Sequence, residues 1–538
     1  MVFARRSTTL LAAIIASCAM VLSLTACTSD NKTVVDGQTT VTSNSAGGVA
    51  VFTPSDGITL NQQMPLNKWA KLVPDLTKAL VDAGFKKGDI DHTTSDSLDK
   101  QSRAIQDFVV DHLSNNTTDD SGIAIAPDNM TLLVAPVVEA DASTRQYGDY
   151  VSQNLSTNDV TDEGATSDGE SSEDDSSNTE SDSTASDEQA QAVDRLVSSL
   201  KLAKESGMHV VLLGNSIEGY KPDAFVKFSD AQTIGKLQAE KMVSKLKLDK
   251  ASKDNPKYIE VLLPYTAVDE KGNANDSTFA QEAFRGIWQV LGSYYQKGVV
   301  ESPSGTLDGK STENDWQAVA YDAAKGGSTA KVLDKRLAKT DGQSTLTRID
   351  GIITMNDYIA SEVVKELDDL GYTGSAADIN PQITISGIVG NITGKKDLSR
   401  DAVPDPIKSP ENDNANDSSS SDDDADEDTS ASDKDRDSQW PLVTGYGAYV
   451  SNIPSIVNGK QWMTGMEDRQ TIATDIAQAC AKLNKDEALN SMPSIRSSEV
   501  GGVKKIPTIS EPLLAVSASN LKSALIDPGY ISLADAGL

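Results

Sequence analysis

Polar side chains that can hydrogen-bond a small polar ligand come directly after apolar, β-rich runs of this chain. Asn356 and Asp357 follow the run 349–354, and Tyr446 follows the run 442–444. Ligands bind beyond the carboxyl ends of parallel strands, so these side chains are candidates for a site. Asn and Asp also cap helices well, and that alternative stays open for Asn356 and Asp357. The strand-end positions of interest are 53–54, 135–136, 214–215, 356–357 and 445–446.

Catalysis is poorly supported by the remaining reactive side chains. The three histidines, His92, His112 and His209, are widely separated, and neither a Gly-x-Ser-x-Gly motif nor a metal-spaced cluster occurs in the sequence. Cys480 lies in a helical pattern with no base nearby, which indicates a small buried side chain. We therefore expect a binding protein and not an enzyme, with no metal site and no cofactor.

Short β-rich runs alternate with longer runs of helical spacing along most of the chain. This alternation predicts an α/β fold with parallel sheets and right-handed crossovers. Which of the runs 383–388 and 442–444 occupies one sheet position is open, and the sequence favours 442–444. The predicted strands are 49–53, 130–135, 209–213, 258–263, 349–354 and 442–444, and the predicted helices are 66–84, 98–113, 192–203, 278–291, 359–370 and 453–457.

The net charge of −32 is concentrated in two tracts. Residues 159–188 contain 12 acidic residues and no Lys or Arg, and residues 411–437 contain 12 acidic residues with Lys434 and Arg436. Both tracts are Ser/Asp-rich and nearly free of apolar residues, so we expect two disordered acidic insertions. The run 422–424 lacks the spacing of a calcium loop. The acidic charge also argues against nucleic acid as a partner.

The N-terminus has the three parts of a bacterial export signal. Arg5 and Arg6 precede the apolar run 10–24, which is too short to span a bilayer, and Cys27 follows small residues. Leu-Thr-Ala-Cys resembles the lipobox of bacterial lipoproteins, which implies a signal peptide over 1–26 and lipidation at Cys27. An ordinary secretory signal and an uncut anchor are the alternatives. We expect a flexible tether over 27–48 and anchoring to the outer face of the bacterial cytoplasmic membrane.

Several segments, in their order and spacing, resemble the type I solute-binding proteins of ABC transporters, most closely the xylose and multiple-sugar branch. The resemblance covers most of residues 49–535, apart from the acidic tracts. The segments are Lys505 to Thr508, Glu511 to Val516, Asn520, Asp527 to Tyr530, Ile456 to Gln461, Met463-Thr464, Asp230 to Ala239, Phe284 to Gly286 and Asn356-Asp357.

This resemblance implies two Rossmann-like lobes with parallel sheets, joined by a three-segment hinge (periplasmic binding protein type I). The implied partners are a small-molecule solute, which we expect to be a carbohydrate, and an ABC permease or a membrane sensor; we expect a monomer. The expected lobes are 49–222 plus 461–508 for lobe one and 223–460 for lobe two, with 509–538 as a C-terminal hinge and tail segment.

The resemblance also implies ligand contacts at individual positions. Trp316 matches an aromatic residue that stacks on the sugar, with a packing tryptophan as the alternative. Gln461 matches a hinge residue, and Lys68 and Trp69 stand where the family has an Arg-Trp pair. The complete set of predicted ligand-binding residues is Lys68, Trp69, Asn215, Asp230, Asn275, Trp316, Asn356, Asp357, Tyr446 and Gln461.

Two positions depart from the family pattern. Asn215 and Ser216 stand where the sugar binders carry an Asp-Arg pair, and Gly447 stands where they carry a strand-end Asp. Losing an Arg or Asp from a buried polar site leaves its partners to find other bonds. The sequence therefore predicts either a different ligand or a site remodelled around Tyr446. A surface sensor and a scaffold without ligand are alternatives to transport.

Overall fold

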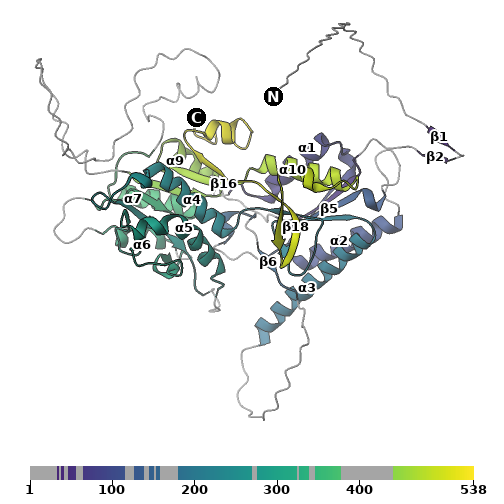
Figure 1. Ribbon diagram of the computed structural model, residues 1–538, viewed down its shortest axis with the longest axis horizontal. Coiled ribbons are helices and arrows are strands. Elements are labelled where there is room, and N and C mark those ends of the chain that lie inside the picture. The colour runs from purple at the N-terminus through teal and green to yellow at the C-terminus, as the bar shows by residue number, and fades with distance from the viewer. Residues whose placement is uncertain are drawn as a thin grey trace, which may run out of the picture. The chain divides into compact units, whose positions relative to one another are not determined.

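The chain forms two units, residues 1–44 and 45–538, and each is described by itself. In the first, β1 (Thr33–Val35) and β2 (Gln38–Thr40) pair antiparallel (Figure 1). These strands correct the prediction of a tether without structure over 27–48, and their Thr and Val residues favour extended backbone. The signal segment and Cys27 lie outside the described residues. The computed structural model describes residues 33–35, 38–40, 46–55, 65–115, 126–138, 144–150, 153–157, 180–268, 275–323, 326–338, 346–376 and 440–538.

A seven-stranded sheet forms the centre of lobe one. Its strands are β3 (Gly48–Pro54), β4 (Ile90–Ser95), β5 (Met130–Val134), β7 (His209–Leu213), β9 (Ala224–Lys227), β17 (Ile495–Val500) and β18 (Val503–Ser510). They lie in the order β17–β18–β9–β7–β5–β3–β4. The β17–β18 pair is antiparallel and the other neighbouring pairs are parallel. A short parallel pair, β6 (Asn154–Leu155) with β8 (Ser216–Ile217), follows β5 and β7 in the chain.

Helices cover both faces of this sheet. They are α1 (Trp69–Asp82), α2 (Leu98–Asn115), α3 (Glu180–Glu205) and α10 (Arg469–Leu483). Helix α1 packs beside α10, and α2 packs beside α3 (Figure 1). Val49 and Val51 share a core with α1 and α10, whereas Ala50 and Phe52 share a core with α2 and α3. This division follows because alternate side chains of a strand point to opposite faces.

Lobe two is built on a six-stranded sheet. Its strands are β10 (Lys257–Val261), β12 (Val300–Glu301), β14 (Gly351–Ile353), β15 (Leu442–Tyr446), β16 (Met463–Met466) and β19 (Leu514–Ser517). They lie in the order β12–β10–β14–β15–β16–β19, with β19 antiparallel to β16 and the other pairs parallel. A short parallel pair, β11 (Leu263–Pro264) with β13 (Ala320–Tyr321), extends beyond β10.

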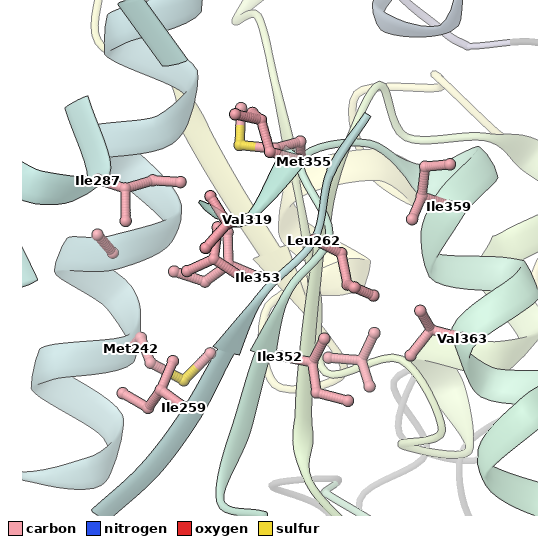
Figure 2. Packing of buried hydrophobic residues seen from close by; sticks show 14 of the residues in the cluster. Met242, Ile259, Leu262, Ile287, Val319, Ile352, Ile353, Met355, Ile359 and Val363 are labelled. Atoms are coloured by element: carbon pink, nitrogen blue, oxygen red, sulfur yellow. The ribbon is translucent and has the colours of Figure 1, made fainter. Parts of the chain in front are cut away.

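The helices of lobe two also lie on both faces of their sheet. They are α4 (Ala231–Leu246), α5 (Thr278–Gln296), α6 (Ser328–Arg336), α7 (Asp357–Asp369) and α9 (Ile453–Val457). Figure 2 shows Met242 and Ile287 on one side of the strands, with Ile359 and Val363 on the other. Both faces of the sheet are therefore buried, as expected for parallel strands.

Two glycines allow α4 and α5 to pack closely. A Cβ at Gly235 would lie 2.2 Å from the carbonyl oxygen of Ala283, and a Cβ at Gly286 would lie 2.0 Å from that of Gln232. Both separations are far below contact distance, so any side chain at either position forces the helices apart.

The chain passes between the lobes at residues 228–230, 467–468 and 511–513. These crossings lie a few residues beyond the predicted lobe boundaries at 222, 460 and 508. The difference arises because β9 pairs with β7 in lobe one and β16 pairs with β15 in lobe two. Apolar residues that are buried on both faces fit either sheet, so only the pairing decides their lobe.

The predicted fold class, two α/β lobes of largely parallel strands joined by three segments, is confirmed. Residues 442–446 form β15 between β14 and β16, so this run occupies the sheet position that the sequence left open. Cys480 is completely buried, as predicted. Within the described residues, every helix is too short or too polar to cross a membrane.

The acidic tracts lie largely outside the described residues. Helix α3 nevertheless begins at Glu180, inside the tract predicted to be disordered over 159–188. Acidic residues near a helix N-terminus interact favourably with the helix dipole, which accounts for this longer helix. The tract 411–437 lies entirely outside the described residues.

Candidate ligand-binding site

Asp357 is the buried polar centre of lobe two at the end of β14. Its Oδ2 accepts hydrogen bonds from the backbone N of Tyr449 (2.9 Å) and from Oγ1 of Thr464 (2.8 Å), and its Oδ1 accepts from Nε2 of Gln461 (2.7 Å). Burial raises the pKa of this carboxyl from 3.8 to about 6, against the lowering effect of these bonds. A Cβ at Gly445 would lie 2.1 Å from Asp357 Oδ1, so the neighbouring strand leaves room for no larger residue.

Gln461 and Asn356 complete this cluster. Gln461 Oε1 accepts from Nδ2 of Asn452 (2.8 Å), so both ends of its amide are bonded to protein groups. Asn356 caps α7, because its Oδ1 accepts from the backbone N of Ile359 (2.9 Å). Its Nδ2 donates to Oε1 of Gln146 (3.1 Å), a residue of lobe one. Asn356 is therefore both a helix cap and a contact between the lobes.

Tyr446 reaches the hinge, where it meets Ser229 and Glu467 at two of the crossings. Ser229 donates to Glu467 Oε1 through its backbone N (2.7 Å) and its hydroxyl (2.5 Å), and the Tyr446 hydroxyl lies 2.5 Å from Ser229 Oγ. Burial raises the pKa of Glu467 from 4.5 to about 7, and it also holds the pKa of Tyr446 well above its usual value. Sequence reasoning missed Glu467, because its contacts come from segments far apart in the chain.

Lys68 and Trp69 form the lobe-one side. Lys68 Nζ pairs with Asp149 Oδ1 (2.8 Å), and the backbone N of Trp69 donates to Asp149 Oδ2 (3.1 Å). The Trp69 ring packs edge-on against Tyr150 (5.0 Å between centroids) and Phe228 (5.6 Å). Both predicted residues thus contact the segment that follows β5.

Asn215 is buried and joins three parts of lobe one. Its Oδ1 accepts from the backbone N of Gln153 (2.9 Å), and its Nδ2 donates to the carbonyl of Pro136 (2.9 Å). The neighbouring Ser216 donates to Oδ1 of Asn154 (2.7 Å). These bonds hold the chain on either side of the segment that carries Asp149.

The other predicted residues lie elsewhere in lobe two. Trp316 is buried in the lobe-two core and packs edge-on against Tyr265 (5.1 Å). Asn275 Nδ2 donates to the carbonyl of Thr266 (2.8 Å). Asp230 caps α4 by accepting from the backbone N of Thr233 (2.7 Å). These three side chains thus bond or pack on groups other than those around Asn356 and Lys68.

Residues Gln146–Tyr150 connect the two sides, and the sequence analysis did not identify them. Gln146 contacts Asn356 of lobe two, and Asp149 and Tyr150 contact Lys68 and Trp69 of lobe one. The only local signal was an aromatic pair around Gly-Asp directly before a tract with few apolar residues. We call the groups of both lobes that contact Gln146–Tyr150 the interlobe site.

Neither a metal centre nor a separate hollow competes with this site as a location for the predicted residues. Within the described ranges, no group of three or more His, Cys, Asp or Glu side chains is arranged to hold a metal ion. A hollow of about 630 Å³ on lobe one, lined by His209, Asp223 and Arg496 among others, contains none of the ten predicted ligand-binding residues.

Comparison with known proteins gives similarity to solved structures alone: no family model and no curated protein matches the chain. An ABC transporter solute-binding protein from Clostridium phytofermentans with bound β-D-glucose is 18% identical (91% of this chain, 99% of that chain, TM-score 0.45). A carbohydrate transporter solute-binding protein from Chloroflexus aurantiacus in complex with D-glucose is also 18% identical (92% and 98%, TM-score 0.42). The arabinose-binding protein AraP from Geobacillus stearothermophilus is 10% identical (89% and 99%, TM-score 0.42). At these identities the similarity concerns the fold alone.

Proposed function

We propose that this chain is an extracytoplasmic solute-binding protein of an ABC importer, anchored through a lipid at Cys27, and that it binds a sugar or a related polar solute between its lobes. A membrane sensor that reads the same binding event is the alternative partner. In either case, closure of the lobes around the solute is the signal that the membrane partner receives.

The observation that supports this proposal most strongly is the meeting of strand-end polar groups from both lobes. Asn356 lies at the end of β14 in lobe two, and Lys68 lies at the start of α1 in lobe one. Both contact one short segment, Gln146–Asp149, so they lie around one space. Amide, ammonium and aromatic groups placed in this way suit a polyhydroxylated ligand, whose hydroxyls bond polar groups while its C–H faces pack on rings.

The remaining predicted contacts enter the proposal with different weight. Gln461, Asp357 and Tyr446 position the residues at the ends of β14 and β15, since their polar atoms are bonded to other protein groups. Trp316 is proposed as a sugar-stacking residue, on the family resemblance alone. Asn275, Asp230 and Asn215 are proposed as residues that hold the surrounding loops.

A scaffold without ligand is the second candidate, and one observation favours it. Asn356, Asp357, Gln461 and Lys68 all spend hydrogen-bonding capacity on other protein groups. A ligand would have to replace some of these bonds, and each bond left unmade costs about 1–3 kcal/mol.

A thermal-shift screen separates these candidates. The full chain, carrying Cys27→Ser so that it is not lipidated, is heated with a panel of pentoses, hexoses, polyols and glycosides. A specific ligand present at 100 times its dissociation constant stabilises the folded protein by about 2.7 kcal/mol. We expect a stabilising sugar, and the absence of a shift across the panel would favour the scaffold.

Two variants then test the placement of the site. Asn356→Ala removes the amide that faces lobe one, and Trp316→Ala removes the proposed stacking ring, so each is expected to weaken sugar binding. A control, Asn314→Ala, removes an exposed amide two residues from Trp316. Unchanged sugar affinity in both test variants would place the ligand elsewhere.

A further inference from the structure

The segment Gln146–Tyr150 belongs to lobe one but reaches into lobe two. Gln146 is held there at two points: its Oε1 accepts from Asn356 Nδ2 (3.1 Å), and its backbone carbonyl accepts from the Tyr449 hydroxyl (2.7 Å). Tyr449 is itself held in place, because its backbone N donates to Asp357. The segment is thus bonded to the buried polar cluster of lobe two.

Tyr147 adds an apolar contact to these hydrogen bonds. It is 1% exposed and belongs to the hydrophobic core of lobe two, although its chain neighbours are part of lobe one. Its ring lies 4.6 Å from the ring of Phe279 and 6.3 Å from that of Tyr446, measured between centroids. An aromatic ring inserted into the opposite lobe in this way holds the two lobes together.

The other end of the segment is fixed to lobe one. Asp149 pairs with Lys68 and accepts from the backbone N of Trp69, and its own backbone N donates to the carbonyl of Asn67 (2.8 Å). Tyr150 packs on Trp69, and its hydroxyl donates to the carbonyl of Lys68 (2.5 Å). The segment therefore links both lobes through bonds at each end.

Gly148 allows this passage. Its φ is +97°, and a Cβ there would lie 2.5 Å from the carbonyl oxygen of Asn67. Only glycine accepts both the left-handed backbone and the close approach, so the turn between Tyr147 and Asp149 depends on it.

The groups that this segment occupies are those proposed above for a solute. Gln146 satisfies the amide of Asn356, Asp149 satisfies the ammonium of Lys68, and Tyr150 covers the ring of Trp69. We propose that Gln146–Tyr150 is a built-in occupant of the interlobe site, which holds the lobes together without solute and must be displaced before a solute binds. The competition with a sugar rests on the proposed function, whereas the holding of the lobes does not.

A tethered occupant lowers the apparent affinity for a solute by the fraction of time that it leaves the site. Two hydrogen bonds and a buried ring favour the occupied state, so we expect the displaced state to be a minor one. Removing the lobe-two contacts of the segment is therefore expected to tighten sugar binding by at least about tenfold.

The test variant is Gln146→Ala with Tyr147→Ala, which removes the lobe-two contacts and leaves Asp149 and Tyr150 in place. The matched control is Tyr294→Ala with Gln296→Ala, because these residues of α5 have the same side chains on the surface of lobe two, away from the interlobe site. A second test variant, Tyr449→Phe, removes one hydrogen bond to Gln146 and keeps the ring.

Lobe separation is measured by energy transfer between dyes on Gln106→Cys in α2 and Lys365→Cys in α7, two exposed positions. The full chain also carries Cys18→Ser and Cys27→Ser, and Cys480 is completely buried and so takes no dye. Without sugar, we expect lower transfer in the double variant, a smaller decrease in Tyr449→Phe, and no change in the control. Unchanged transfer in both test variants would overturn the proposal that the segment holds the lobes.

Sugar binding is measured on the same chains by titration calorimetry, starting with D-glucose, D-xylose and L-arabinose. Tighter binding in the double variant than in the control supports the competition, and equal affinities overturn it while leaving the proposed function in place. If the lobes separate but neither the double variant nor the control binds any sugar, the occupant stands and the proposed function fails.

Discussion

Replacing Glu467 by glutamine is expected to flatten the pH dependence of the protein's stability between pH 4.5 and 7. Glu467 lies at the second crossing between the lobes, and its carboxylate accepts from the backbone N and the hydroxyl of Ser229 and from the hydroxyl of Tyr446 (3.4 Å). No cation forms an ion pair with it in the described part of the chain, so its burial is offset by neutral donors alone.

The sign and size of the effect follow from its pKa. Burial raises the pKa of Glu467 from 4.5 to about 7, so the folded protein binds this proton more tightly than the unfolded chain does. The resulting stabilisation is complete below pH 4.5 and is lost as the pH rises through 7, and the difference between the two pKa values corresponds to about 3 kcal/mol. Glutamine cannot ionise, so the variant lacks this contribution to the slope.

The assay is urea unfolding followed by tryptophan fluorescence at a series of pH values from 4.5 to 8. The control Glu313→Gln removes the same charge from an exposed position of lobe two and is expected to keep the slope of the unsubstituted protein. If Glu467→Gln also keeps that slope, the carboxyl is not buried among neutral donors, and the role assigned to it in the hinge is refuted.

Three further predictions concern the neighbouring cluster and the anchor. Gly445→Ala is expected to destabilise the protein by about 1–3 kcal/mol, because its Cβ would lie 2.1 Å from Asp357 Oδ1 and 2.8 Å from Gln461 Nε2; an unchanged urea midpoint would contradict this. In Asp357→Asn the stability is expected to lose its decrease between pH 3.8 and about 6, since burial raises the pKa of this carboxyl in the folded state and the protonated form is the stabilising one; a slope like that of the unsubstituted protein would count against it. Cys27→Ser is expected to abolish incorporation of an alkyne-tagged fatty acid and to release the protein from membranes, and labelling that persists would exclude Cys27 as the acceptor.

The strands and helices could be predicted where burial alone determines the pattern. The runs 130–135 and 209–213 became the central strands β5 and β7, because parallel strands covered on both faces must be apolar throughout. β4 was not predicted, since it lies at the edge of the sheet and most of its side chains are exposed and polar. β9 was missed because four residues are too few for a periodic signal.

The polar site could be predicted only in part, because local sequence does not specify distant partners. The strand-end positions of Asn356 and Asp357 were visible, and so was the tendency of Asn356 to cap a helix. Its contact with Gln146, 210 residues away in the chain, was not visible. Hydrogen bonds of this kind depend on how the two lobes meet, which no periodicity records.

The two departures from the sugar-binding pattern now have a common structural setting. Ser216 stands in place of an arginine, and its hydroxyl bonds Asn154, in the chain just beyond Gln146–Tyr150. Gly447 stands in place of an aspartate with φ of +112°, and a Cβ there would lie 3.0 Å from the ring of Tyr449, whose hydroxyl holds Gln146. Both departures therefore adjoin groups that position the segment between the lobes. An arginine and an aspartate at these places would need a ligand to satisfy them, whereas a serine and a glycine leave the site to a segment that brings its own carboxylate, amide and rings.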